Sequence, residues 1–199
     1  MKQVLIETQL FKPSKGLLSE GKMSERGNPL VEGILATCEV ENGNGRYYSE
    51  DLWRREIDKY MELVQENRAT GELDHPESQV INLKNVSHNI KDINWDGKNI
   101  MGTIEILPTP SGNILKALID SGITVGVSSR GMGSLEQKGD LMEVQDDFEL
   151  LCWDFVSTPS NPGSFMALKE GKENNINLYT KANSIVTEIL CANGNFPMF

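Results

Sequence analysis

The chain has 199 residues, which is enough for one well-buried domain and too short for two comfortable ones. Its net charge is −10 and no basic stripe is visible, which argues against nucleic acid as the main ligand, because phosphate binding needs clustered Lys and Arg. No stretch approaches the roughly 20 apolar residues that span a bilayer, so no membrane association is expected.

The N-terminal third is predicted to contain a loop, a strand and an amphipathic helix. Residues 12–29 are rich in Gly, Ser, Lys and Glu and are typical of a flexible loop, whereas 30–40 is predicted as a strand that ends in a tight turn at 42–45. Ser49 is suited to cap a helix that runs to about Asn67. Helical spacing places a set of apolar side chains on one face of it, for core packing: Trp53, Ile57, Tyr60, Met61 and Val64.

The middle of the chain predicts two strands, 80–93 and 99–107, around a turn at 95–98. The second strand alternates Ile and Gly with other residues, the period of a half-buried strand. A second helix is expected over 110–121, since Pro suits a first helical turn and Gly122 can end the helix. Its apolar face is expected to hold Ile114, Leu115, Leu118 and Ile119.

Residues 124–137 and 141–156 are predicted to form a hairpin about 138–140. Many strands with only two helices predict an α+β chain that is mainly β, a closed or nearly closed antiparallel β-barrel decorated by two or more helices. Residues 1–168 are expected to form the domain. Residues 169–199 are expected to be a C-terminal tail that is flexible or docked.

Three cysteines, Cys38, Cys152 and Cys191, are odd in number and widely spaced. They fit a reducing compartment, and neither a disulfide framework nor a zinc cluster is indicated.

Three short segments each place a catalytically useful side chain inside or beside an apolar run. They are Gly-Glu-Leu-Asp-His-Pro at 71–76, Gly-Val-Ser-Ser-Arg-Gly at 126–131 and Trp-Asp-Phe-Val at 153–156. A serine, a histidine and an acid are what nucleophilic acyl transfer needs. The order His, Ser, Asp along the chain differs from the three common triad orders, so the folds that carry those orders are not indicated.

Taken together and in this order, the segments resemble the prohead maturation proteases of myovirus-type tailed bacteriophages, a family similar in fold to the herpesvirus assemblins. The resemblance runs from 31–34 through 46–48, 71–76 and 126–135 to 159–160. It implies a serine endopeptidase without metal or cofactor that works inside the phage prohead, in the host bacterial cytoplasm. Its implied substrates are the scaffold or core proteins and the major capsid protein.

The resemblance places the nucleophile at Ser128 and the catalytic histidine at His75. Without it, Ser128 and Ser129 would be interpreted as ordinary strand serines that point to opposite faces. The other histidine, His88, lacks a motif and is interpreted as a packed or strand-edge residue.

Asp154 is the expected third member, at about the distance beyond the serine where assemblins carry theirs. Both faces of its strand are otherwise apolar, so its carboxylate must be paired and hydrogen-bonded. A neutral His75 would supply one such bond. Asp74 is the rival acid, and it ranks lower because in an extended segment it points away from the face that His75 uses.

The donors of the oxyanion hole are the least defined part. Assemblins use an arginine-bearing loop soon after the third catalytic residue, but the corresponding loop here, 157–164, contains no arginine. The backbone N–H groups of Gly163 and Ser164, and the side chains of Ser129 and Arg130, are the candidates for oxyanion or substrate contacts. Arg130 is equally compatible with a surface position.

Two other functions stay open at this point: a non-catalytic β-barrel structural or scaffolding subunit of a phage particle, and an esterase with the same three residues. A shallow groove would favour a protease and a deep apolar pocket an esterase. The oligomeric state, including a homo-oligomer, is also open. The family's preference for an apolar residue, any residue and then Glu makes Glu20-Gly21 and Glu170-Gly171 the best candidates for self-cleavage.

Overall fold

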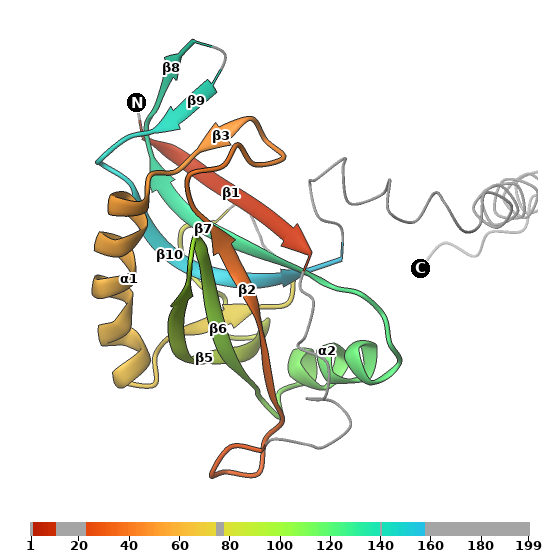
Figure 1. The fold of residues 1–199 in the computed structure, drawn as a ribbon. Coiled ribbons are helices and arrows are strands. Elements are labelled where there is room, and N and C mark those ends of the chain that lie inside the picture. Colours follow the sequence, from red (N-terminus) through yellow and green to blue (C-terminus); the bar gives the residue numbers. More distant parts are fainter. Residues whose placement is uncertain (1, 11–22, 75–77, 140, 158–199) are drawn as a thin grey trace, which may run out of the picture. The chain divides into compact units, whose positions relative to one another are not determined.

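The protein is represented by a computed structural model that describes residues 2–10, 23–74, 78–139 and 141–157, without the side chains of 8–10. Figure 1 shows how the described elements are arranged. The predicted tail at 169–199 and most of the predicted loop at 12–29 lie outside the described residues.

The described strands form three sheets, and all neighbours pair antiparallel except β3 with β9. The first sheet has the order β1 (Gln3–Leu10), β7 (Gly126–Gly133), β10 (Glu149–Val156). The second has the order β2 (Leu30–Thr37), β6 (Asn99–Ile106), β5 (Val86–Asp96), β4 (Thr70–Glu72). The third has the order β3 (Arg46–Tyr47), β9 (Leu141–Val144), β8 (Leu135–Lys138).

The mainly β fold with two helices is confirmed, but the expected closed barrel is wrong for the described part of the chain. No strand pairing joins β1 to β2, so the first two sheets stay open on that side. On the other side their strand pairing is limited, among the described residues, to a single parallel bridge between Leu73 and Phe155, because β4 is three residues long and ends at Glu72. Closure would need continuous pairing around the whole ring of strands.

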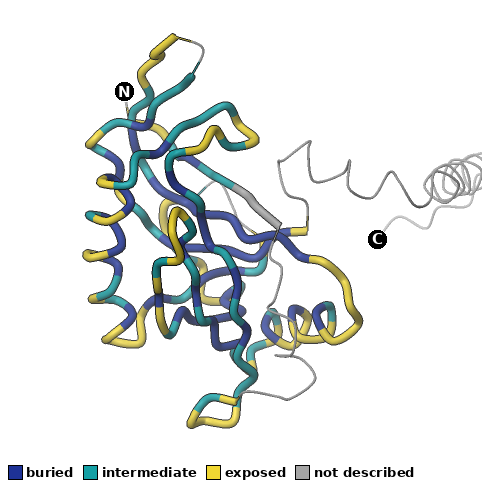
Figure 2. The backbone as a smooth tube through the Cα atoms, viewed as in Figure 1, coloured by how far each residue is buried: buried dark blue, intermediate teal, exposed yellow. Residues whose placement is uncertain are grey.

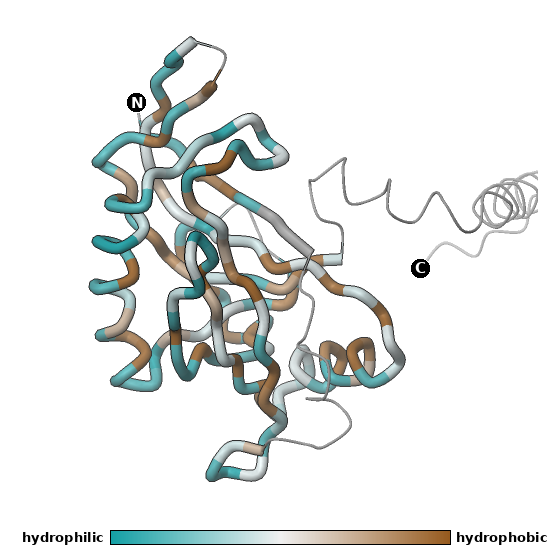
Figure 3. Tube along the Cα trace, viewed as in Figure 1, coloured by the Kyte–Doolittle hydropathy of each residue, from teal (hydrophilic) through white to brown (hydrophobic). Residues whose placement is uncertain are grey.

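Helix α1 spans Glu50–Gln65, and the predicted cap is confirmed because the Ser49 side chain accepts a hydrogen bond from the Leu52 N–H at 3.2 Å. Helix α2 spans Pro110–Asp120, with Thr109 as its N-cap. The predicted apolar face of α2 is right for Leu115 and Ile119, which are buried, and wrong for Ile114, which is 54 % exposed. The alternating hydropathy along both helices is visible in Figure 3.

Strand β5 begins at Val86, six residues later than predicted. The preceding residues form hydrogen-bonded turns, in which the Val80 N–H donates to Ser78 Oγ and the Asn85 N–H donates to the Asn82 carbonyl. Val80 and Leu83, which made this segment resemble a strand, are 75 % and 79 % exposed. The described residues 78–85 before β5 are therefore a loop, and they follow the segment that contains His75.

The predicted hairpin from 124 to 156 is confirmed in outline, although it is broken into two pieces. β8 and β9 form the projecting hairpin at the top of Figure 1, and β7 and β10 pair farther down. The bend between the two pieces is held by Asp147, which accepts hydrogen bonds from the Ser134 N–H and hydroxyl.

Aromatic side chains fill the space between α1 and the strands. Trp153 of β10 stacks on Trp53 of α1 with ring centroids 6.2 Å apart and meets Tyr60 edge-on at 4.9 Å. Figure 2 shows that the central strands are buried along most of their length. This packing fixes one face of β10, and it leaves the next residue, Asp154, on the other face.

Candidate active site

The strand register brings two of the predicted catalytic residues directly opposite one another. In the antiparallel pair β7 and β10, Ser128 pairs with Asp154 and Ser129 pairs with Trp153. Because side chains alternate, Ser128 and Asp154 share one face while Ser129 shares the other with Trp153, next to α1. Directly opposite residues have Cβ atoms about 5 Å apart, so Ser128 and Asp154 are neighbours in space.

Both side chains are fully buried, and each has an oxygen without a hydrogen bond. Among the described residues, neither Ser128 Oγ nor Asp154 Oδ2 has a hydrogen-bond partner. Buried polar atoms in native proteins are almost always satisfied, and a catalytic role is one of the explanations for those that are not. Two such atoms side by side on one strand pair are therefore the strongest sign of a site in this structure.

The other oxygen of Asp154 is fully engaged. Oδ1 accepts hydrogen bonds from the Glu72 N–H at 2.9 Å and from Arg130 Nη2 at 3.2 Å. Oδ2 lies 3.0 Å from Arg130 Nε, an ion-pair contact without hydrogen-bond geometry. Burial raises the pKa of Asp154, and the Glu72 N–H and the Arg130 charge oppose that rise.

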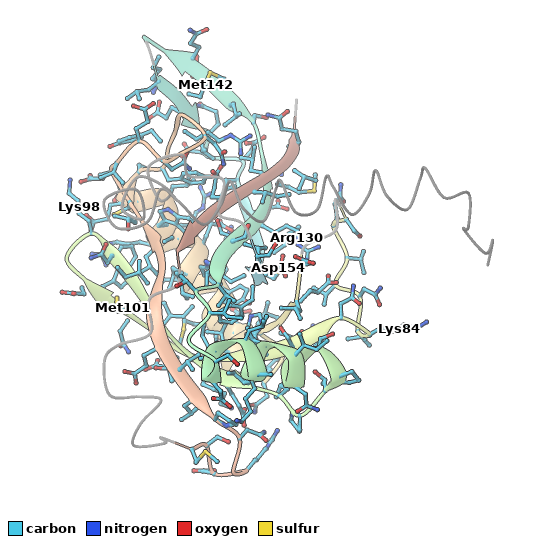
Figure 4. The ribbon with its side chains drawn as sticks, turned by 90° about the vertical axis from the view of Figure 1, so that its right-hand side faces the viewer. Lys84, Lys98, Met101, Arg130, Met142 and Asp154 are labelled. Carbon is cyan, nitrogen blue, oxygen red and sulfur yellow. The ribbon has the colours of Figure 1, made fainter. Side chains whose placement is uncertain are left out.

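Arg130 lies on the same face and is 1 % exposed, so the surface position that the sequence left open is wrong. Its Nη2 donates to Glu72 Oε1 at 2.9 Å, and its Nη1 donates to the Ser78 carbonyl at 2.8 Å. Cys152 Sγ lies 3.1 Å from Nη2 and 3.3 Å from Nε. Figure 4 shows Arg130 beside Asp154 in the interior, whereas Lys84 points outward.

The chain reaches the His75 motif next to Asp154. Leu73 forms its bridge with Phe155, and the Asp74 N–H donates to the Phe155 carbonyl at 2.8 Å. Asp74 itself is exposed and has a φ of 60°, in the left-handed region that Asp adopts more readily than most residues. His75 lies outside the described residues, but the residue before it is fastened to β10 one position past Asp154.

Comparison with known proteins identifies this arrangement. Residues 7–176 match the family model described as prohead core protein serine protease. The chain belongs to this family. It is 32 % identical over 145 residues to the prohead core protein protease of Enterobacteria phage T4. The aligned region covers 70 % of this chain and 68 % of the T4 protein. A solved structure of the bacteriophage T4 capsid assembly protease matches with a TM-score of 0.71 and 28 % identity, over 79 % of this chain and 99 % of that chain.

The resemblance inferred from the three sequence segments is thereby confirmed, and the chain is a serine protease of capsid maturation. The non-catalytic structural subunit is not favoured, because the matching family and both relatives are proteases.

In this prohead protease, Ser129 lies on the opposite face of β7 from Ser128. Ser129 is 2 % exposed and lines a cavity of about 230 Å³ together with Glu7, Tyr48 and Trp53, on the α1 side of β7. Gly163 and Ser164 lie outside the described residues, as do Glu20-Gly21 and Glu170-Gly171. The roles predicted for all of these residues stay predictions.

Two buried residues that contact Arg130, namely Glu72 and Cys152, were not predicted from the sequence as part of the site. Glu72 lies in the Gly-Glu-Leu-Asp-His-Pro segment, three residues before His75, and is fully buried. Cys152 lies opposite Arg130 in the β7–β10 register and is fully buried too. The signal for Glu72 was present, since an acid flanked by Gly and Leu in a strand-like motif needs a partner when buried.

Over the described residues, no group of three or more His, Cys, Asp and Glu side chains is placed to hold a metal ion. No helix in the same part of the chain is long and apolar enough to cross a membrane.

His88 is a packed residue, as the sequence predicted. It is 1 % exposed, its Nε2 donates to the Trp153 carbonyl at 3.1 Å, and its Nδ1 accepts from Ser87 Oγ at 2.9 Å. Burial lowers the pKa of His88 to about 4, so the ring is neutral near pH 7.

The buried His88 predicts a loss of stability in acid. Below pH 6.5 the unfolded chain binds a proton at His88 that the folded protein excludes down to about pH 4. The free energy of unfolding should therefore fall by up to about 3 kcal/mol between these pH values on account of this one group. His88→Gln lacks this titrating group. Its free energy of unfolding, measured by urea unfolding at pH 7, 5.5 and 4, should therefore change less with pH than that of wild type. Parallel curves for the two proteins would show that His88 is not responsible.

Proposed function

We propose that Ser128, His75 and Asp154 carry out peptide hydrolysis as nucleophile, general base and orienting carboxylate. The observation that carries the proposal is a pair of buried oxygens, Ser128 Oγ and Asp154 Oδ2, that make no hydrogen bond among the described residues and lie on residues opposite one another in the β7–β10 register. The third group, His75, follows directly after Asp74, whose N–H is bound to the Phe155 carbonyl on the same strand as Asp154.

The chemistry follows from these positions. Ser128 Oγ attacks the substrate carbonyl while the imidazole of His75 takes its proton, and the imidazolium then gives that proton to the leaving amine. Water, activated by the same imidazole, hydrolyses the acyl-enzyme. Since Arg130 and the Glu72 N–H occupy Oδ1 of Asp154, Oδ2 is the acceptor for the ring N–H of His75.

The developing oxyanion needs N–H donors that are in place before attack. We assign this role to the backbone N–H groups of Gly163 and Ser164. Arg130 is less suited to it, because its guanidinium already donates to Glu72, Asp154 and Ser78.

The substrates are proposed from the relatives. One is named a prohead core protein protease and the other a capsid assembly protease. We assign to this chain the core or scaffold proteins and the major capsid protein of its phage, cleaved inside the prohead in the host cytoplasm. Self-cleavage at Glu20-Gly21 or Glu170-Gly171, which would remove the tail at 169–199 in the second case, belongs to the same proposal, as does assembly into a homo-oligomer.

Variants of the two partner residues test the assignment. His75→Ala should lower kcat by a factor on the order of 10³ or more, because the proton acceptor is lost. Asp154→Asn should lower it by about 10²–10³ and leave measurable activity, since it disturbs the tautomer and the charge but not the nucleophile. The double variant should be no slower than His75→Ala, because the groups act as a unit.

Cleavage of purified core protein, followed by gel densitometry, provides the rates, and circular dichroism confirms that each variant is folded. A fully active Asp154→Asn protein would contradict the role of Asp154 and would make the exposed Asp74 the next candidate. Full activity of His75→Ala would remove the proposed base.

A further inference from the structure

Glu72 and Arg130 form a buried ion pair that takes no direct part in the hydrolysis described above. Glu72 is fully buried and Arg130 is 1 % exposed, and their closest charged atoms are 2.9 Å apart. Removing two charges from water costs about as much as their attraction returns, so stability alone is a weak explanation for such a pair.

The pair is attached to the chain just before His75. The Glu72 N–H donates to Asp154 Oδ1 at 2.9 Å, which fixes the end of β4 on β10. The next two residues continue along the same strand, as the Leu73 bridge and the Asp74 hydrogen bond to Phe155 show. The N-terminal flank of 75–77 is thus set by Glu72 and Asp154.

The side chains of Arg130 and Glu72 hold the chain after His75. Arg130 Nη1 donates to the Ser78 carbonyl at 2.8 Å, directly after the segment 75–77. The Asn82 N–H donates to Glu72 Oε1 at 3.1 Å, and Asn85 Nδ2 donates to Glu72 Oε2 at 3.2 Å. The C-terminal flank therefore depends on a guanidinium from β7 and a carboxylate from β4.

We propose that Glu72 and Arg130 are positioning residues that fasten both flanks of segment 75–77 to the strands carrying Ser128 and Asp154. This inference rests on the proposed role of His75. A general base must lie within hydrogen-bond reach of the proton that it takes, and a displacement of about 1 Å can cost 10²-fold in rate. A loop that carries the base needs fixed anchors on the strand that carries the nucleophile, and Arg130 lies two residues from Ser128 on the same face of β7.

The test uses Arg130→Met, Glu72→Gln and the milder Asn85→Ala in the full chain. The substrate is a quenched-fluorescent peptide of residues 165–175, which contains Leu168-Lys169-Glu170. Well below the melting temperature of each variant, kcat should fall by tenfold or more in the first two and severalfold in Asn85→Ala, with KM within about threefold of wild type. Hydrogen exchange should increase in 73–85 and stay unchanged in β6.

Arg46→Met is the matched control, because Arg46 pairs with Glu7 at 2.7 Å on the other side of β7, away from Ser128. It should lower the melting temperature and keep the wild-type kcat. The proposal is overturned if Glu72→Gln and Asn85→Ala keep the wild-type kcat, or if exchange rises equally in 73–85 and β6. If Arg130→Met does not fold, these two variants decide alone.

Ser128→Ala, measured in the same assay, distinguishes a failure of the proposed nucleophile from a failure of the proposed positioning pair. If it keeps its activity, the proposed function is wrong whatever the other variants do. If it is inactive while Glu72→Gln and Asn85→Ala match wild type, the nucleophile stands and only the positioning pair is wrong.

Discussion

Ser128→Ala is expected to abolish proteolysis, with kcat lowered by a factor on the order of 10⁴ or more. The substitution removes the attacking oxygen and leaves only the binding contribution to catalysis. The fold should be intact, because Ser128 Oγ makes no hydrogen bond among the described residues and nothing is left unsatisfied by its removal. The melting temperature should be equal to that of wild type or slightly higher, since a buried unpaired hydroxyl is itself destabilising.

Ser129→Ala is the matched control for this prediction. The two serines are adjacent, equally buried and of the same chemistry, but Ser129 faces Trp153 and α1. Its loss should change the cleavage rate of core protein by no more than a few fold. The reverse pattern, an inactive Ser129→Ala and an active Ser128→Ala, would mean that the nucleophile acts from the other face of β7.

Gly71→Ala is expected to destabilise the protein by at least about 3 kcal/mol, enough to unfold a marginally stable domain. A Cβ at this position would collide with the Trp153 carbonyl and would lie 2.5 Å from the His88 ring atoms Cε1 and Nε2. The carbonyl belongs to a buried strand and the ring is hydrogen-bonded to it, so neither can move away easily. The expected result is a large fall in the urea midpoint, measured by tryptophan fluorescence.

Gly27→Ala separates crowding from backbone strain. Gly27 has a φ of 76°, but the space that an alanine methyl group would occupy there is open, so its substitution should cost only the strain of about 1–2 kcal/mol. Equal losses for the two variants, or a Gly71→Ala protein as stable as wild type, would contradict the close approach of β4 to β10.

Local patterns predicted the helices well because the determinants of a helix lie within one or two turns. Ser49 caps α1 and Pro110 begins α2, both as predicted, and the spacing of Trp53, Ile57 and Tyr60 defined the buried face of α1. The same reasoning failed at Val80, where apolar residues in a loop looked like the start of β5. Alternation alone does not distinguish an exposed loop from a strand edge.

Barrel closure could not be predicted, because it depends on which strands pair with one another and not on the residue pattern within each strand. A count of strands does not reveal that β4 is three residues long, or that strand pairing with β10 is limited, in the described part of the chain, to the bridge between Leu73 and Phe155. Sheet order is set by contacts between residues far apart in the chain, and no local pattern encodes them.

For the site, residue types and motif order made Ser128 and Asp154 candidates, but they did not predict the partner that Asp154 has in the described structure. The expectation of a buried carboxylate with a hydrogen-bonded partner was right, and the partners found are Arg130 and the Glu72 N–H. The sequence left a surface position open for Arg130, and its buried contact with Asp154 depends on the register of β7 with β10, which residue types do not encode.

The most direct test of the central claim is covalent labelling with a fluorophosphonate, which reacts with an activated serine, under conditions in which core protein is cleaved. Peptide mass spectrometry should place one adduct on Ser128, present in Ser129→Ala and absent from Ser128→Ala and His75→Ala. An adduct on Ser129, or an active protein with no adduct on Ser128, would contradict the account.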